Sequence, residues 1–189
     1  MARTLSNMVE LGTSAPWFSL PDSEGHIHSL DDASDSPVVL IAFICNHCPF
    51  VKHLADELAA LSKEYSSQGV ATFAIMSNDV DTYPDDAPPR MREEAQMRNY
   101  EFPYLHDADQ GIAKAYQATC TPDFFVYGPE RTLVYRGQFD DSRPDSGTAD
   151  GKDLRNALDD ALAGRPVTHP QKPSLGCNIK WKPENNPNS

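Results

Sequence analysis

The order of apolar and polar positions predicts strands alternating with helices. Residues 38–44 form a continuous apolar run rich in β-branched side chains, as expected for a central strand covered on both faces. Residues 70–76 form a second run of this kind. The segment between them is predicted to be an amphipathic helix, because its apolar side chains recur at helical spacing: Leu54, Leu58, Leu61 and Tyr65.

The other elements are shorter, and turn residues separate them. Residues 15–20 and 27–30 flank a polar turn, which predicts a hairpin ahead of the main sheet. The second half predicts a helix, a short strand, a short helix, a hairpin and a last helix, at 88–97, 103–105, 111–116, 124–136 and 152–162. We therefore expect an α/β domain over residues 1–167, with a mixed sheet and helices on both faces. Residues 168–189 are rich in Pro and Asn and predict an irregular tail, packed on the domain or trailing from it.

Composition restricts the partners that the chain can have. A length of 189 residues fits one domain, and 39% hydrophobic residues fit a globular one. The net charge of −12 disfavours nucleic acid and anionic membranes as partners, because phosphates would be repelled. No apolar stretch is long enough for a membrane span, and residues 1–10 lack the apolar core of a signal peptide. We expect a cytoplasmic protein with reduced thiols, and leave its oligomeric state open.

The strongest chemical signal is Cys45-Asn46-His47-Cys48, placed between the first apolar strand and the helix that follows it. Two cysteines with two residues between them can close a disulfide within one turn. This position is predicted to put the Cys45 sulfur beside the free N–H groups at the start of the helix. Such a thiol has a pKa of roughly 3.5–7.5, against about 8.5 for free cysteine. The motif therefore predicts thiol–disulfide exchange.

The same spacing occurs in half of a zinc site, which needs further ligands. No second C-x-x-C or H-x-x-H is present, although Cys120, Cys177 and His47 could supply ligands. We expect no metal and no cofactor.

Several motifs together resemble a known superfamily. An apolar strand, the cysteine pair followed by Pro49, an amphipathic helix and Thr121-Pro122 before a strand resemble the thioredoxin fold. The chain looks most like the peroxiredoxin-like, AhpC-TSA-type proteins of that superfamily with a C-N-H-C motif. The segments that carry this likeness lie at 15–25, 43–52, 77–79, 83–86 and 173–181.

The resemblance implies roles for the site residues. Cys45 would be the attacking thiolate, exposed at the start of the helix, and Cys48 the resolving thiol. The bond before Pro122 would be cis and face the cysteine pair, leaving the backbone of Thr121 free to pair with an incoming peptide. His47 would favour the thiolate, giving a reduction potential less negative than the roughly −270 mV of thioredoxin.

Other residues near the motif are given weaker roles. Cys120 and Cys177 are candidate auxiliary thiols, or else a small buried side chain and an anchor for a flexible tail. An acidic loop could lie over the site, but a solvated surface is the favoured interpretation for Asp79, Tyr83, Asp85 and Asp86.

We expect a thiol–disulfide oxidoreductase that acts through Cys45 and Cys48. Its partners would be a disulfide-bearing protein or small thiol substrate and a separate redox partner. The first alternative is a peroxiredoxin-like antioxidant peroxidase. Peroxiredoxins use Pro-x-x-x-Thr-x-x-Cys, but counting back from Cys48 gives Cys45 at the threonine position and Ile41 at the proline position. The second alternative is a redox-silent metal-binding or interaction module.

Overall fold

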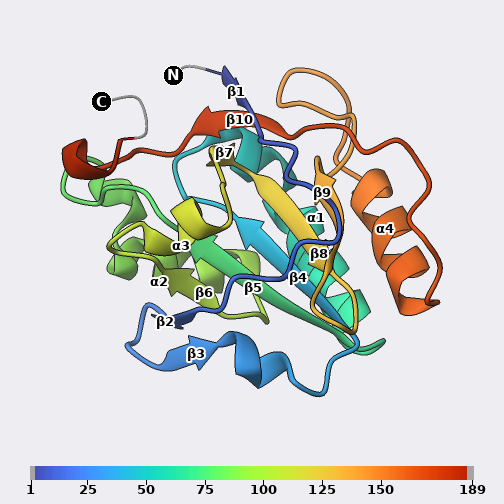
Figure 1. Ribbon diagram of the computed structural model, residues 1–189. Coiled ribbons are helices and arrows are strands. Elements are labelled where there is room, and N and C mark those ends of the chain that lie inside the picture. Colours follow the sequence, from blue (N-terminus) through green and yellow to red (C-terminus); the bar gives the residue numbers. More distant parts are fainter. Residues whose placement is uncertain (1–2, 187–189) are drawn as a thin grey trace.

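A five-stranded mixed sheet forms the centre of the molecule (Figure 1). The computed structural model describes residues 3–186. The strand order is β6-β5-β4-β8-β9. β4 pairs in parallel with β5 and β5 with β6, whereas β8 pairs antiparallel with both of its neighbours, β4 and β9. The strands are β4 Val38–Phe43, β5 Val70–Met76, β6 Tyr104–His106, β8 Asp123–Tyr127 and β9 Leu133–Gly137. This arrangement confirms the predicted mixed sheet.

Both faces of the sheet are covered, which explains why β4 is apolar throughout. Leu40 and Ala42 point into a core shared with helices on one face, and Val39 and Ile41 point into a core on the other. The first core is covered by α1 Pro49–Ser66, α2 Pro88–Arg98 and α4 Lys152–Leu162. The second is covered by α3 Gly111–Ala115 and by an N-terminal segment with β2 Ser19–Pro21, β3 Ile27–Ser29 and the short 3-10 helix η1 Leu30–Ala33.

A second, smaller sheet joins the two ends of the chain to the middle. Its order is β1-β10-β7, with β1 Arg3–Leu5, β10 Leu175–Asn178 and β7 Cys120–Thr121. The prediction of an irregular tail is therefore wrong for β10, which pairs antiparallel with both neighbours. A 3-10 turn, η3 Pro183–Asn185, follows it. The tail packs on the domain, and Ile179 is buried in the second core.

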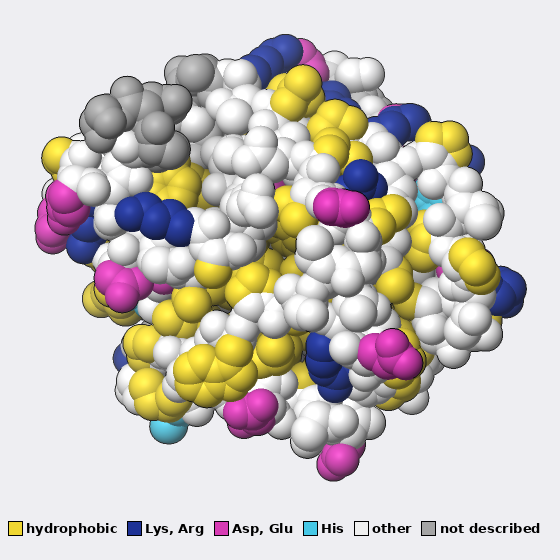
Figure 2. Space-filling view, in the orientation of Figure 1, with side chains coloured by type: hydrophobic (Ala, Val, Ile, Leu, Met, Phe, Trp, Pro, Cys, Tyr) yellow, Lys and Arg dark blue, Asp and Glu magenta, His cyan; other side chains and the backbone are white. Residues whose placement is uncertain are grey.

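None of the described helices is long and apolar enough to cross a membrane. Hydrophobic side chains gather on the lower part of the face seen in Figure 2, over the region of β2 and β3. Two large exposed side chains belong to this part of the chain, Trp17 just before β2 and Ile27 in β3.

Candidate active site

The cysteine pair lies where β4 passes into α1. The helix begins at Pro49, whose missing N–H costs nothing at the first helical position, and Cys48 is the N-cap. The backbone N–H of Val51 donates to the Cys48 sulfur. The sequence predicts that the Cys45 sulfur lies beside the free N–H groups at the start of the helix. In the structure, the sulfur that accepts a hydrogen bond from such an N–H is that of Cys48.

All four cysteines are free thiols and all are buried. Cys45 is 1% exposed, Cys48 0% and Cys177 2%, so the expectation of an exposed attacking thiol is wrong. Two segments lie against the pair: β10 contacts Cys48 through Cys177, and the loop that ends at Asp86 binds the backbone of Asn46 beside Cys45. Reagents from solvent therefore meet a closed site in this conformation.

Thr121 and Pro122 lie against the cysteine pair. The Thr121–Pro122 bond is cis, as the resemblance implies. The Thr121 hydroxyl lies 3.3 Å from the Cys45 sulfur, and the Cys48 thiol can donate to the Thr121 carbonyl at 3.2 Å. However, the backbone of Thr121 is not free to receive a peptide strand, because it pairs with Cys177 of β10. The chain's own C-terminal strand occupies the edge that was predicted to be open.

Cys177 joins the site and Cys120 does not touch it. The sulfurs of Cys48 and Cys177 lie 3.0 Å apart, which puts Cys177 in a fixed strand and not in a flexible tail. Cys120 is buried on β7, and its sulfur contacts the carbonyl of Pro122. Neighbouring residues of a strand face opposite sides, so Cys120 points away from the side on which Thr121 meets Cys45.

The contacts put the negative charge of the reduced site on Cys48. A hydrogen bond from Cys45 lowers the pKa of Cys48 to about 5, against the opposing effect of burial; Cys177 and the N–H of Val51 also lower it. The pKa of Cys45 is raised well above its ordinary value, first by its hydrogen bond to Cys48, then by burial and the negative charge of Asp86. Burial and the contact with Cys48 raise the pKa of Cys177 to about 12. The predicted low pKa is therefore found on Cys48 and not on Cys45.

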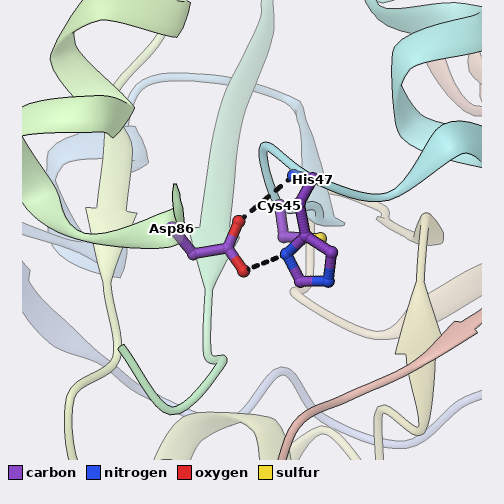
Figure 3. Close-up of side chains that lie close together, drawn as sticks. All are labelled: Cys45, His47 and Asp86. Atoms are coloured by element: carbon purple, nitrogen blue, oxygen red, sulfur yellow. Dashed lines mark hydrogen bonds and ion pairs between the residues drawn. The ribbon is translucent and has the colours of Figure 1, made fainter. Parts of the chain in front are cut away.

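His47 binds a buried carboxylate. Its Nδ1 lies 2.5 Å from Oδ2 of Asp86, and its backbone N–H donates to Oδ1 of the same group at 3.3 Å (Figure 3). The backbone N–H of Asn46 and the side chain of Asn78 also donate to Asp86, each at 2.8 Å. Burial opposes ionisation of Asp86, but the bonds from His47 and Asn78 hold its pKa below the ordinary value.

The likeness to known proteins agrees with this geometry. The sequence model of the AhpC/TSA family matches residues 11–136, two thirds of the chain. The chain belongs to the AhpC/TSA family. A comparison with curated proteins finds no match for this family member.

Solved structures place this AhpC/TSA protein among thioredoxin-like folds. A hypothetical protein from Sinorhizobium meliloti 1021 is 50% identical, with a TM-score of 0.94, over 95% of this chain and 99% of the other. The peroxidoxin BcpB from Mycobacterium tuberculosis is 18% identical, with a TM-score of 0.61, over 82% and 96%. The thioredoxin domain of a thiol-disulfide oxidoreductase from Bacteroides vulgatus is 16% identical, with a TM-score of 0.58, over 72% and 91%. The predicted thioredoxin-like fold is confirmed.

Part of the acidic loop belongs to the site of this AhpC/TSA protein: the prediction of a solvated surface is wrong for Asp79 and Asp86, whereas Tyr83 and Asp85 are exposed. Asp86 ends the 3-10 turn η2 Pro84–Asp86 and is fully buried, and Asp79 is 6% exposed. The ring of Tyr83 stacks on His47, with centroids 5.5 Å apart. Asn46, to which the sequence gave no role, ties the motif to this loop by donating from its side chain to the Asp85 carbonyl. A signal was present in the sequence, since both segments carry the family likeness, but nothing local marked Asp86 for burial.

One group of side chains offers the donor atoms of a metal site. Cys45, His47 and Asp86 each present a ligand atom, and these atoms lie within 4.8 Å of one another. Sulfur, imidazole and carboxylate together suit zinc. Because His47 and Asp86 are already bonded to each other, a metal would have to replace that bond. Cys120 and Cys177, the other ligands considered from the sequence, do not belong to this group.

Proposed function

We propose that this AhpC/TSA protein is a thiol–disulfide oxidoreductase that exchanges disulfides through Cys45 and Cys48. The observation that carries the proposal is the hydrogen-bonded pair of sulfurs at the start of α1, one of which has a pKa of about 5. Such a pair holds a thiolate ready to attack and a thiol ready to resolve. Family membership supports redox chemistry of this class.

The reaction takes place in two exchanges. The thiolate attacks one sulfur of a substrate disulfide, forms a mixed disulfide and releases the first substrate thiolate. The second cysteine then attacks the mixed disulfide, closes the Cys45–Cys48 bond and releases the second thiolate. The substrate gains two electrons and two protons, and the protein loses them.

In the proposed reaction Cys48 makes the first attack. The sequence gave that role to Cys45, but the contacts around the pair favour the thiolate on Cys48 and disfavour it on Cys45. In the proposed order Cys45 resolves the mixed disulfide. Trapping decides the order, because a mixed disulfide persists only where the resolving cysteine has been removed. Because the Cys177 sulfur lies 3.0 Å from that of Cys48 and could also resolve the bond, the trapping variant carries both Cys45→Ser and Cys177→Ser. We expect this double variant to hold substrate on Cys48; a trapped species in Cys48→Ser alone would restore the order expected from the sequence.

Access to the pair requires movement of its cover. Because both sulfurs are buried, a substrate reaches them only when β10 or the 77–86 segment moves aside. The proposal keeps the expected partners, a disulfide-bearing protein or small thiol substrate and a separate redox partner, and the expected cytoplasmic location.

Two assays run side by side test the function. Insulin reduction with dithiothreitol and consumption of hydrogen peroxide are measured for the wild type, Cys45→Ser, Cys48→Ser and Cys120→Ser. We expect insulin reduction in the wild type and in Cys120→Ser, and its loss in both variants of the pair.

The same assays separate the alternatives. Peroxide consumption that needs Cys48 alone, without insulin reduction, would identify a peroxidase. Neither activity, together with one bound zinc per chain that Asp86→Asn abolishes, would identify a metal-binding module. Either result would overturn the proposed exchange.

A further inference from the structure

The C-terminal strand brings a third thiol to the cysteine pair. Cys177 of β10 stands opposite Thr121 of β7, so its side chain lies on the same face of the small sheet as that of Thr121. On that face its sulfur lies 3.0 Å from the sulfur of Cys48. The backbone N–H of Cys177 also donates to the Cys48 sulfur. Three thiols, from a loop, a helix cap and a strand, thus meet at Cys48.

This contact is built by the fold and does not depend on a mobile side chain. Cys177 is held by two strands, since it pairs with Arg3 of β1 as well as with Thr121. Its neighbour Gly176 passes so close to Thr121 that a Cβ there would collide with the Thr121 carbonyl. The two sulfurs are therefore kept in contact for as long as the small sheet is closed.

Cys120 provides a comparison, because it is a buried cysteine on the neighbouring strand β7 whose sulfur does not form such a contact with Cys48. It is as deeply buried as Cys177 and lies one residue from Thr121. Its sulfur makes a long hydrogen bond to the Pro122 carbonyl, 3.8 Å away. Burial raises its pKa well above the ordinary value, and within residues 3–186 its sulfur makes no hydrogen bond to another sulfur.

We propose that Cys48 is shared between two alternative internal disulfides, Cys45–Cys48 and Cys48–Cys177, so that Cys177 is a second exchange partner within the site. The proposal rests on the proposed function and deepens it, since β10 then holds the place of a substrate strand and supplies its thiol. The Cys48–Cys177 form frees Cys45 and fastens β10 to the start of α1. Oxidation by this route closes the site, and reduction of that bond is needed before β10 can move.

The exchange between the two forms needs no outside oxidant or reductant. Cys177 attacks the Cys48 sulfur of the Cys45–Cys48 bond, the new bond forms, and Cys45 leaves as a thiolate. The proton lost by Cys177 is balanced by the proton gained by Cys45. The two forms are isomers with the same number of electrons, and their ratio is set by the relative stability of the two bonds.

Disulfide mapping tests the inference on the full chain. Wild type, Cys45→Ser, Cys177→Ser and Cys120→Ser are equilibrated in mixed reduced and oxidised glutathione, quenched with acid, alkylated, digested and analysed by mass spectrometry. In the wild type and in Cys120→Ser we expect both bonds, with populations within about tenfold of each other, equivalent to potentials within about 30 mV. Cys177→Ser should contain Cys45–Cys48 alone, and Cys45→Ser should contain Cys48–Cys177 alone.

Two results of the disulfide mapping would overturn the inference. Wild type with only the Cys45–Cys48 bond would refute it, and so would Cys45→Ser that keeps glutathione on Cys48 without closing a bond to Cys177. If Cys45→Ser does not fold, the wild-type map decides alone. Failure of the proposed function looks different, because it is the loss of insulin reduction in the wild type, whichever bonds the map contains.

Discussion

The Cys48 sulfur accepts hydrogen bonds from three parts of the chain, of which only β10 is distant in the sequence. The N–H of Val51 comes from α1, the thiol of Cys45 from the preceding loop, and the N–H and thiol of Cys177 from β10. Each donor favours the charged form of the sulfur, and together they outweigh the cost of burying it. A helix start alone would lower the pKa less, because the largest lowering comes from the thiol of Cys45 and a further one from Cys177.

A pH titration of the thiolate absorbance tests this assignment. Cys48 has a pKa of about 5, so we expect a thiolate signal that is present at neutral pH and disappears as the pH falls through that value. Cys48→Ser should abolish this transition. Cys120→Ser is the matched control and should retain it, because Cys120 ionises only well above its ordinary value. A transition near pH 5 that survived in Cys48→Ser would show that another cysteine carries the charge.

Asp86 joins the Cys45–Cys48 motif to the 77–86 segment. The variant Asp86→Asn measures how much this connection contributes to the stability of the protein. The carboxylate accepts four hydrogen bonds, from the backbone of Asn46, from the backbone and ring of His47, and from Asn78. Since its folded pKa is lowered from 3.8, Asp86 contributes stability that is present above that value and is lost as the pH falls through the folded pKa. At neutral pH we expect Asp86→Asn to lower the free energy of unfolding by roughly 1–3 kcal/mol.

Urea unfolding at neutral and acidic pH provides the measurement. The difference in free energy of unfolding between wild type and Asp86→Asn should shrink once the pH is below the folded pKa of Asp86, because both side chains are then neutral. Asp85→Asn is the control on the same turn. Asp85 is exposed and uses only its backbone carbonyl to bind Asn46, so its replacement should change stability little. Equal losses for the two variants would contradict the central position of Asp86.

At the scale of elements, the fit between β10 and β7 depends on one glycine. A Cβ on Gly176 would meet the backbone of Thr121 and Pro122, so Gly176→Ala must push the strands apart. Overpacking of this kind costs roughly 1–3 kcal/mol, and we expect alkylation of Cys48 by iodoacetamide to become about tenfold faster or more. Gly128→Ala is the control, because its Cβ would be an ordinary 3.5 Å from Val134. Unchanged alkylation in Gly176→Ala would show that β10 is not the cover of the site.

The same strand shows why the sequence predicts some elements and not others. β4 and β5 are long apolar runs, and the cores on both sides of the sheet need them, so local pattern identifies them. β10 has four residues without alternation, and its pairing with β7 joins residues more than fifty positions apart. Its register depends on a backbone contact at Gly176, which no hydrophobic pattern encodes.

Some features of the candidate site could likewise be predicted from the sequence and others could not. The sequence pattern correctly predicted that the cysteine pair lies at a strand–helix junction, and the family resemblance correctly implied the cis bond before Pro122. The sequence could not reveal that Asp86 is buried, because the donors that make its burial tolerable come from two other segments. The sequence likewise predicts the low pKa on Cys45, because it reveals neither that Cys45 donates to Cys48 nor that Cys177 contacts Cys48 from a distant strand.

At the scale of the whole molecule, the two ends of the chain close over the active site. β1 and β10 pair with each other, and Ser6 and Ser174 exchange hydrogen bonds of 2.9 and 2.8 Å beside that pair. The large sheet lies between two apolar cores, whereas β1 and β10 are short strands near the ends of the chain (Figure 1). Short elements with few buried apolar contacts open at a lower free energy than the core. We therefore expect the small sheet to open without unfolding of the large one.

Hydrogen exchange and cysteine alkylation of the reduced protein should report this same opening. The amides of β10 are expected to exchange faster than those of β4, since β4 is central and fully buried. When reclosing is fast, alkylation of Cys48 depends on the equilibrium population of the open form, so low urea should change its rate in parallel with exchange at β10. Gly176→Ala should raise both rates by the same factor and leave β4 unaffected. Alkylation that instead followed exchange at β4 would mean that the thiols become accessible only on global unfolding, and an enzyme working through a local opening of β10 would then be excluded.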